Sequence, residues 1–170
     1  MARTKQIPLT TTYLQMLAPP EDLAVKPPVE HMHIERVREP SVPFYREMYD
    51  AIGGKWQWSE RKKLTDDQVR VIIRDPDIFI YVLRSSGKII GFAELDFRQR
   101  PDLELKYFGL VPECIGKGLG KYFLSWTINK AWELNPRRVW LHTCSNDHPR
   151  ALDMYRKAGF VVYKEDSKGT

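Results

Sequence analysis

The sequence predicts a single domain of the α+β class, built around a mixed β-sheet. Three observations support this. From residue 31 onward, strand patterns come first and then alternate with helix patterns. Two apolar runs on either side of a glycine turn at 85–88 predict a β-hairpin. A glycine-rich segment then joins a strand pattern to the longest helix pattern of the chain.

Residues 1–30 differ from the rest of the chain and are expected to form an N-terminal arm. Prolines punctuate this segment at Pro8, Pro19, Pro20, Pro27 and Pro28. Proline fixes its own φ angle and lacks an N–H donor, so these positions favour loops and extended chain. A short strand is expected around Thr11 to Leu17, with the rest of the arm as loop. Residues 31–170 are then expected to form one domain.

The first periodic elements are a strand and two helices. Residues 31–37 alternate as a strand, and a helix is predicted over 42–52 because Phe44 and Met48 recur at helical spacing. A second helix is predicted over 65–74. Thr65 followed three residues later by glutamine is typical of a capping box, in which each side chain satisfies a free backbone N–H.

The remaining elements alternate between strands and helices. The hairpin consists of strands at 78–83 and 89–97, and a third strand of the same kind follows at 103–111. The strongest helix covers 118–134, with an apolar stripe formed by Leu119, Phe123, Ile128, Ala131 and Trp132. A strand at 137–143, a helix at 149–158 and a strand at 160–163 complete the predicted order.

Charge and composition restrict the partners. The chain has 170 residues with 27 Lys and Arg against 22 Asp and Glu, a net charge of +5. The basic residues are spread along the chain among acidic neighbours, whereas nucleic-acid binders usually gather them into a stripe. We therefore expect no nucleic-acid partner. A small polyanionic ligand, such as a phosphorylated cofactor, fits the same modest excess.

Cysteine content and hydropathy predict a cytoplasmic protein. The two cysteines, Cys114 and Cys144, form neither a CxxC pair nor a set of four ligands, which argues against a disulfide scaffold and a zinc finger. A reducing compartment is therefore expected. No run approaches the roughly 18 apolar residues of a membrane helix, and no signal peptide is supported, so no membrane partner is expected.

The segment 111–121 carries the strongest chemical signal. Gly116, Gly118 and Gly120 alternate between a strand and a helix, where backbone N–H groups can converge on a pyrophosphate near the helix N-terminus. A Walker loop would require glycine at 115, where the chain has Ile115. A dinucleotide-binding loop would require a small residue at 121, where it has Lys121. A glycine-rich turn without a ligand is the alternative.

Two motifs together resemble the GNAT superfamily of acyl-CoA-dependent N-acetyltransferases. The phosphate loop of that family matches at Pro112, Glu113, Gly118 and Gly120. Its later signature matches at Ala151, Tyr155, Gly159 and Phe160. The resemblance covers residues 31 to the end. The chain departs from the family at Ile115, where Arg or Gln is usual, and at His148, where Asn is frequent.

The resemblance implies a fold and an activity. The fold is a central, mixed, mostly antiparallel sheet flanked by helices, splayed between the fourth and fifth core strands counted from residue 31. The activity is acetyl transfer from acetyl-CoA to a primary amine, on a small molecule or a protein lysine, by direct attack in a ternary complex. No metal is expected. The implied cofactor-binding residues are Leu110, Val111, Ile115, Gly116, Lys117, Gly118, Leu119, Gly120, Lys121 and His148.

Two side chains are candidates for proton transfer. An amine with a pKa near 10.4 is mostly protonated at neutral pH, so a base must act before attack. Glu104 lies fourteen residues before Gly118, the register of the strand glutamate that lysine-acetylating family members use as base. A solvent-facing strand carboxylate is the alternative. Tyr155 is the implied acid for the leaving thiolate, or else a packing residue, and a backbone N–H near Leu110 is the implied oxyanion donor.

Substrate-binding candidates lie on the neighbouring strand and between the first two helices. Glu94 and Asp96 share one strand face and are alternative bases or an acidic attractor for a cationic substrate. Trp56 and Trp58 could contact an amine through cation–π interactions, or serve as a core lid. A homodimer is possible. Ile115 and His148 keep a second function open, an acyl-CoA-binding regulatory module with little or no catalysis.

Overall fold

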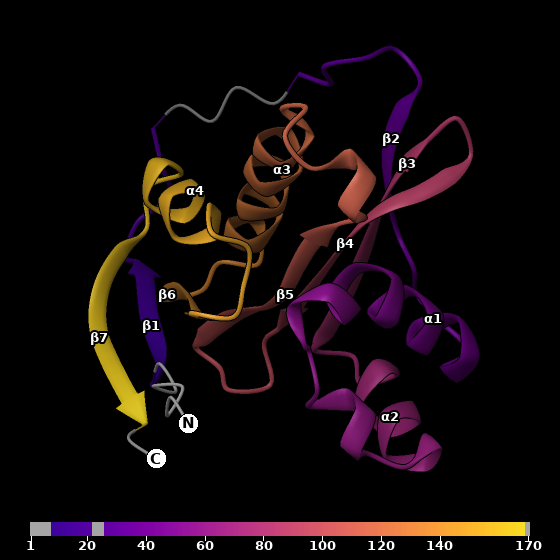
Figure 1. Cartoon of the computed structure of the whole chain (residues 1–170), viewed down its shortest axis with the longest axis horizontal. Coiled ribbons are helices and arrows are strands. Elements are labelled where there is room, and N and C mark those ends of the chain that lie inside the picture. Colours follow the sequence, from indigo (N-terminus) through magenta and orange to yellow (C-terminus); the bar gives the residue numbers. More distant parts are fainter. Residues whose placement is uncertain (1–7, 22–25, 169–170) are drawn as a thin grey trace, which may run out of the picture.

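A computed structural model describes residues 8–21 and 26–168, and its strands form one seven-stranded sheet (Figure 1). The strand order is β2-β3-β4-β5-β6-β1-β7. The strands are β1 (Leu9–Met16), β2 (Met32–Arg36), β3 (Ile78–Ser85), β4 (Lys88–Asp96), β5 (Asp102–Leu110), β6 (Arg138–Cys144) and β7 (Val161–Lys168). The helices are α1 (Val42–Gly53), α2 (Asp66–Ile73), α3 (Leu119–Glu133) and α4 (Ala151–Lys157), with short 3₁₀ turns η1 (Gly54–Trp56), η2 (Arg61–Lys63) and η3 (Pro112–Cys114).

The sheet is mostly antiparallel and opens between β5 and β6, as expected. All neighbouring strands pair antiparallel except β5 and β6. These two run parallel and pair only from Asp102↔Arg138 to Glu104↔Trp140. Within the described ranges no pairing follows that point, so the two strands diverge. Counted from β2, they are the fourth and fifth strands, and the predicted splay is confirmed.

Helices cover both faces of the sheet. Ile78 and Ile80 of β3 pack in one core cluster with residues of α1 and α2. Phe79 and Tyr81 point to the other face, because neighbouring strand residues alternate, and pack in a second cluster with residues of α3 and α4. The α+β class predicted from the sequence is therefore confirmed, with the sheet as the middle layer.

The strand expected near residues 11–17 is β1, and it lies inside the sheet. It pairs with β6 along Thr11↔Cys144 to Met16↔Val139 and with β7 on its other side. The proposed arm thus contributes an interior strand, while its residues 1–7 and 22–25 fall outside the described part of the chain. The division at residue 30 stays a proposal.

Two local features show which sequence signals were informative. The capping box at α2 is confirmed, since Thr65 Oγ1 accepts from the Gln68 N–H at 3.2 Å and Gln68 Oε1 accepts from the Thr65 N–H at 2.9 Å. The last strand is longer than the predicted 160–163, because its polar second half forms a ladder with β1 that no apolar pattern announces. Among the described residues, no helix is long and apolar enough to cross a membrane.

Candidate active site

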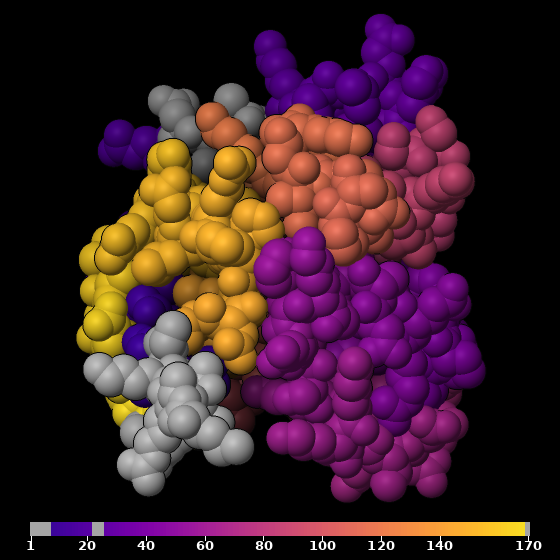
Figure 2. Space-filling view, viewed as in Figure 1, coloured from indigo at the N-terminus to yellow at the C-terminus, as the bar shows by residue number. Residues whose placement is uncertain are grey.

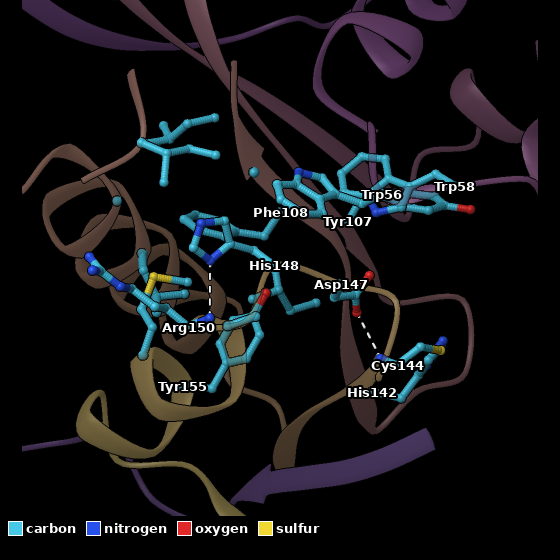
Figure 3. Close-up of a pocket in the computed structure, with 18 of the residues that line it drawn as sticks. Trp56, Trp58, Tyr107, Phe108, His142, Cys144, Asp147, His148, Arg150 and Tyr155 are labelled. Atoms are coloured by element: carbon cyan, nitrogen blue, oxygen red, sulfur yellow. Dashed lines mark hydrogen bonds between the residues drawn. The ribbon is translucent and has the colours of Figure 1, made fainter. Parts of the chain in front are cut away.

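A cavity of about 1020 Å³ opens where β5 and β6 separate (Figure 3). Most of its lining comes from four parts of the chain: the loop after α1, the second half of β5, the glycine loop with the first half of α3, and the segment from the end of β6 through α4. Leu9 of β1 and Tyr49 of α1 also line it. In the space-filling view, the magenta segment that follows α1 meets the orange-yellow segment that leads into α4 (Figure 2). Segments far apart in sequence thus enclose one pocket.

The glycine loop presents backbone to this pocket. Gly116 and Gly118 have φ angles of +85° and +78°, a left-handed conformation that side chains with a Cβ rarely adopt. Gly118 is the N-cap of α3, a helix of 15 residues, and no side chain caps its first amides. Those amides therefore remain free to bind an anion, with the helix dipole adding partial positive charge.

Most predicted cofactor-binding residues line the pocket. Those that do are Leu110, Ile115, Gly116, Gly118, Gly120, Lys121 and His148. Val111, Lys117 and Leu119 do not, although they belong to the same loop. Leu119 packs beside Phe123 in the core, and the Val111 N–H donates to the Ile90 carbonyl at 2.8 Å. If these three residues contribute to cofactor binding, they do so by shaping the backbone of the loop and not through their side chains.

The bond made by Val111 also orients its neighbour. Successive amides of a strand point to opposite edges, so with the Val111 N–H turned to β4, that of Leu110 points toward the opening beside β6. Leu110 lines the pocket at this point. A backbone donor is thus available inside the opening, where the resemblance implies an oxyanion donor.

Three of the four Lys and Arg side chains of the lining lie near the glycine loop and α4, and the fourth, Lys106, lies on β5. Lys121, Arg150 and Lys157 all line the pocket. Arg150 also donates its backbone N–H to His148 Nδ1 at 3.0 Å, which holds the imidazole in place (Figure 3). Three cations and a set of free amides suit a polyphosphate-containing ligand. Ile115, at the position where the family usually has Arg or Gln, adds apolar surface and no charge.

The two tryptophans of the 54–60 loop have different environments. Trp58 packs against Tyr49 and Tyr107, with ring centroids 5.5 and 5.0 Å apart, and a Cβ on Gly53 would lie 2.1 Å from its ring. It therefore acts as a core lid while also lining the pocket. Trp56 instead meets the His148 ring edge-on at 5.0 Å. A residue predicted for the acceptor thus touches one predicted for the cofactor.

Glu104 lies beside the opening, but it does not line the pocket. Its side chain is 14% exposed, and its Oε1 is buried without a hydrogen-bond partner among the described residues. The nearest basic nitrogens are His142 Nδ1 at 3.5 Å and Lys106 Nζ at 3.8 Å. Both His142 and Lys106 line the pocket. Glu104 is therefore separated from the pocket by these two side chains.

The other two carboxylates proposed for substrate lie elsewhere, and neither lines the pocket. Glu94 is fully buried, where it accepts from Arg61 Nη2 at 2.7 Å and from the Tyr45 hydroxyl at 2.5 Å. Asp96 binds the side chain of Arg98 at 2.7 Å. Burial alone would raise the pKa of Asp96, but its bonds to Arg98 hold it below the usual range. Both carboxylates form ion pairs with arginines. The alternation of residues along the strand, on which their prediction rested, does not reveal such pairs.

Tyr155 lines the pocket from α4 and is 8% exposed. It packs against Phe108 and Phe160, with ring centroids 6.4 and 6.1 Å apart. Burial, with a smaller contribution from the charge of Asp147, raises the pKa of its hydroxyl well above the usual value. The hydroxyl therefore stays protonated and can donate. Packing and proton donation are compatible at this position.

Sequence reasoning missed a polar cluster in the pocket lining, made of Glu60, Lys106 and His142. Lys106 Nζ lies 2.9 Å from Glu60 Oε2, which also accepts from the Tyr107 hydroxyl at 3.2 Å. Burial alone would raise the pKa of Glu60, but the Lys106 ammonium and the Tyr107 hydroxyl hold it below its usual range. The sequence signal that could have revealed part of it is the alternation of strand residues, which places Lys106 on the same face of β5 as Glu104.

Comparison with known proteins identifies the class. The family model of the acetyltransferase (GNAT) family matches residues 32–160, which is most of the chain. The chain belongs to the GNAT acetyltransferase family. Glycine loop, splayed sheet and Tyr155 are thus features of a member of this family, and the resemblance inferred from the sequence motifs is confirmed.

Two curated proteins are similar in sequence over about half of the chain. The mycothiol acetyltransferase of Pseudarthrobacter chlorophenolicus is 30% identical over 97 residues, covering 54% of this chain and 30% of that protein. The S-alkylcysteine N-acetyltransferase of Bacillus subtilis is 30% identical over 95 residues, covering 51% of this chain and 53% of that protein. The matched region thus spans about a third and about half of these two relatives.

Solved structures share the fold at low identity. A GCN5-related N-acetyltransferase from Sphaerobacter thermophilus superposes with a TM-score of 0.70 at 16% identity, covering 94% of this chain and 50% of that one. An aminoglycoside acetyltransferase from an uncultured soil metagenomic sample gives 0.61 at 16% identity, covering 76% and 88%. At such identities the likeness describes the architecture alone.

Proposed function

We propose that this chain transfers an acetyl group from acetyl-CoA to the primary amine of an acceptor. The observation that carries the proposal is one pocket with two chemically different ends. Free amides and three cations lie at one end, and a carboxylate–lysine–histidine cluster with an aromatic wall lies at the other. Tyr155 and Leu110 line the same pocket. Family membership supports acetyl-CoA as the co-substrate.

The glycine loop fits the co-substrate. Its pyrophosphate would be held by the backbone at Gly116 to Gly120 and by the first amides of α3, with Lys121 and Arg150 adding positive charge. Val111 and Lys117 would contribute only through the loop backbone. Bound there, acetyl-CoA supplies an activated acetyl group as a thioester.

The acceptor end suits a small amine with an apolar substituent. Trp56, Trp58 and Tyr107 supply aromatic surface, and Glu60 supplies a carboxylate that remains ionised. The contact between Trp56 and His148 joins the two sides of the pocket. The names of the curated relatives include an N-acetyltransferase of S-alkylcysteine. A small-molecule amine is therefore favoured over a protein lysine, with S-alkylcysteines as first probes.

The residues support direct attack. The acceptor nitrogen must lose a proton, and Glu104 is the carboxylate that draws it, through a group that lies between them. The Leu110 N–H stabilises the oxyanion as the new C–N bond forms. Tyr155 donates its proton to sulfur as the C–S bond breaks. Glu94 and Asp96 hold the scaffold, and no step requires a metal or a cysteine nucleophile.

The alternative is an acyl-CoA-binding regulatory module. Its support is Ile115 in place of the usual basic or amide side chain, and His148 in place of the frequent asparagine. Calorimetry with acetyl-CoA and mass analysis of an incubation with S-methylcysteine distinguish the two functions. Binding together with an N-acetylated product supports the enzyme. Binding without product on this amine, on polyamines, aminoglycosides, aryl amines or lysine peptides supports the module.

A further inference from the structure

The sheet opens immediately beside His142. The last parallel pair of β5 and β6 is Glu104↔Trp140, and His142 follows two residues later on the same strand face as Trp140. His142 lines the pocket (Figure 3). Lys106 of β5 lines it as well. The imidazole thus stands at the point where a ligand first enters between the strands.

The Glu104 carboxylate and the His142 ring lie close enough to form a hydrogen bond after a small movement. Glu104 Oε1 is buried and lacks a hydrogen bond within the described chain, and His142 Nδ1 lies 3.5 Å away. A small movement of either side chain closes this distance to a charge-assisted hydrogen bond. Such a bond fixes the ring with Nδ1 toward the carboxylate, which leaves Nε2 as the nitrogen free for another partner.

We infer that His142 takes the proton from the acceptor amine, and that Glu104 is the positioning residue that holds its ring and balances its charge. This inference rests on the proposed acetyl transfer. It follows from placement: His142 lines the pocket and Glu104 does not. It also follows from general chemistry, because free imidazole titrates near 6.5 and a free glutamate near 4.3, so imidazole is the stronger base at neutral pH.

Four side chains surround the His142 ring. Glu104 and Lys106 face it from β5, Glu60 from the loop before η2, and Tyr13 from β1. Two carboxylates and one ammonium leave one net negative charge around the imidazole. The Tyr13 ring lies 5.8 Å from the His142 ring, a separation at which an aromatic face stabilises a neighbouring cation.

The acceptor enters as an ammonium, so Nε2 of His142 first takes one proton and passes it to solvent, which leaves a neutral amine. The amine N–H proton moves to Nε2 of His142 while nitrogen forms its bond to the acetyl carbon. The C–S bond breaks, and sulfur leaves with the proton of the Tyr155 hydroxyl. His142 then releases one proton to solvent and Tyr155 takes one up, which restores both side chains.

The first test compares the pH dependence of kcat/KM in wild type, His142→Gln and Glu104→Gln. We expect His142→Gln to lose about 10²- to 10⁴-fold in rate, the range for a general base, together with the acidic limb of the pH profile. Glu104→Gln should retain the acidic limb of the kcat/KM profile but move it to lower pH, and its loss of rate should be smaller than that of His142→Gln. His33→Gln, on the exposed edge strand β2, is the matched control and should behave as wild type. A limb that survives in His142→Gln and vanishes in Glu104→Gln overturns the inference.

The second test requires no turnover. NMR titration of the His142 ring, assigned with His142→Gln, should show a midpoint at lower pH in Glu104→Gln than in wild type. Equal midpoints contradict the positioning role. If wild type transfers no acetyl group, the proposed function fails and the catalytic role of His142 falls with it. A shifted NMR midpoint would then report only a structural ion pair, so the two failures are distinguishable.

Discussion

The Trp56 and His148 rings meet edge-on at 5.0 Å, which joins the loop after α1 to the segment before α4. Both rings line the pocket, Trp56 on the side proposed for the acceptor and His148 on the side of the glycine loop. Because His148 is itself held by the Arg150 N–H, Trp56 packs against a fixed partner. A ligand bound at one end of the pocket should therefore change the affinity of the other end for its own ligand.

Trp56→Ala should weaken this coupling. The loss of an aromatic pair removes about 0.5–1.5 kcal/mol of contact energy, so KM for acceptor and acetyl-CoA should both rise several-fold. Steady-state kinetics with each substrate varied in turn measures the effect, and Trp56→Phe should restore most of it. A rise in the KM for the acceptor alone would contradict the view that the Trp56–His148 contact supports both ends of the pocket.

The left-handed glycine of the loop can be tested with a matched control. Gly118→Ala and Gly87→Ala place alanine at φ angles of +78° and +80°, and neither Cβ would meet an atom within 4 Å. Each should lose about 1–2 kcal/mol of stability. Only Gly118→Ala, at the anion-binding end, should also lose affinity for acetyl-CoA in calorimetry. Equal affinities in the two variants would show that the loop does not bind the cofactor.

The buried ion pair between Arg61 and Glu94 should contribute strongly to stability. Arg61 Nη2 lies 2.7 Å from Glu94 Oε1, with side chains 6% and 0% exposed. Arg61→Met leaves the Glu94 charge unpaired and should cost about 3–5 kcal/mol in urea denaturation. Arg70→Met, which breaks the exposed pair with Asp67, should cost well under 1 kcal/mol. Similar losses in both variants would contradict a structural role for Glu94.

Tyr155→Phe tests the proton donor. It should lower kcat about 10²-fold or more while the Kd of acetyl-CoA stays unchanged. Burial raises the pKa of this hydroxyl, so it loses its proton only above the ordinary tyrosine value near 10. The wild-type rate should consequently show no alkaline decline caused by Tyr155 below that pH. A decline near pH 8–9 that Tyr155→Phe abolishes would disprove the account, and Tyr163→Phe on β7 is the control.

Much of the fold was predictable because its signals are local. The capping box at Thr65, the hairpin turn at 85–88 and the helical spacing of Phe44 and Met48 each depend on a few neighbouring residues. The polar end of β7 was not predictable, because only its pairing with β1, from a distant part of the chain, makes it a strand.

The site residues also fall into those that local sequence motifs predict and those that depend on distant parts of the chain. The glycine loop and Tyr155 carry motifs, and the structure places both at one pocket. Glu94 shares a strand with Asp96 and looks equally available in sequence, yet its partner Arg61 belongs to η2, thirty-three residues earlier. His142 was passed over because its relation to Glu104 exists only where two strands separate.

The most direct test of acetyl transfer measures thiol release from acetyl-CoA with S-alkylcysteines, polyamines, aryl amines, aminoglycosides and lysine peptides, each against a blank without acceptor. We predict release above the blank with at least one amine, the greatest with a small amine that carries an apolar substituent, and none with its N-acetylated form. Saturable binding of acetyl-CoA with every acceptor at the blank rate would contradict the proposed function and leave a binding module.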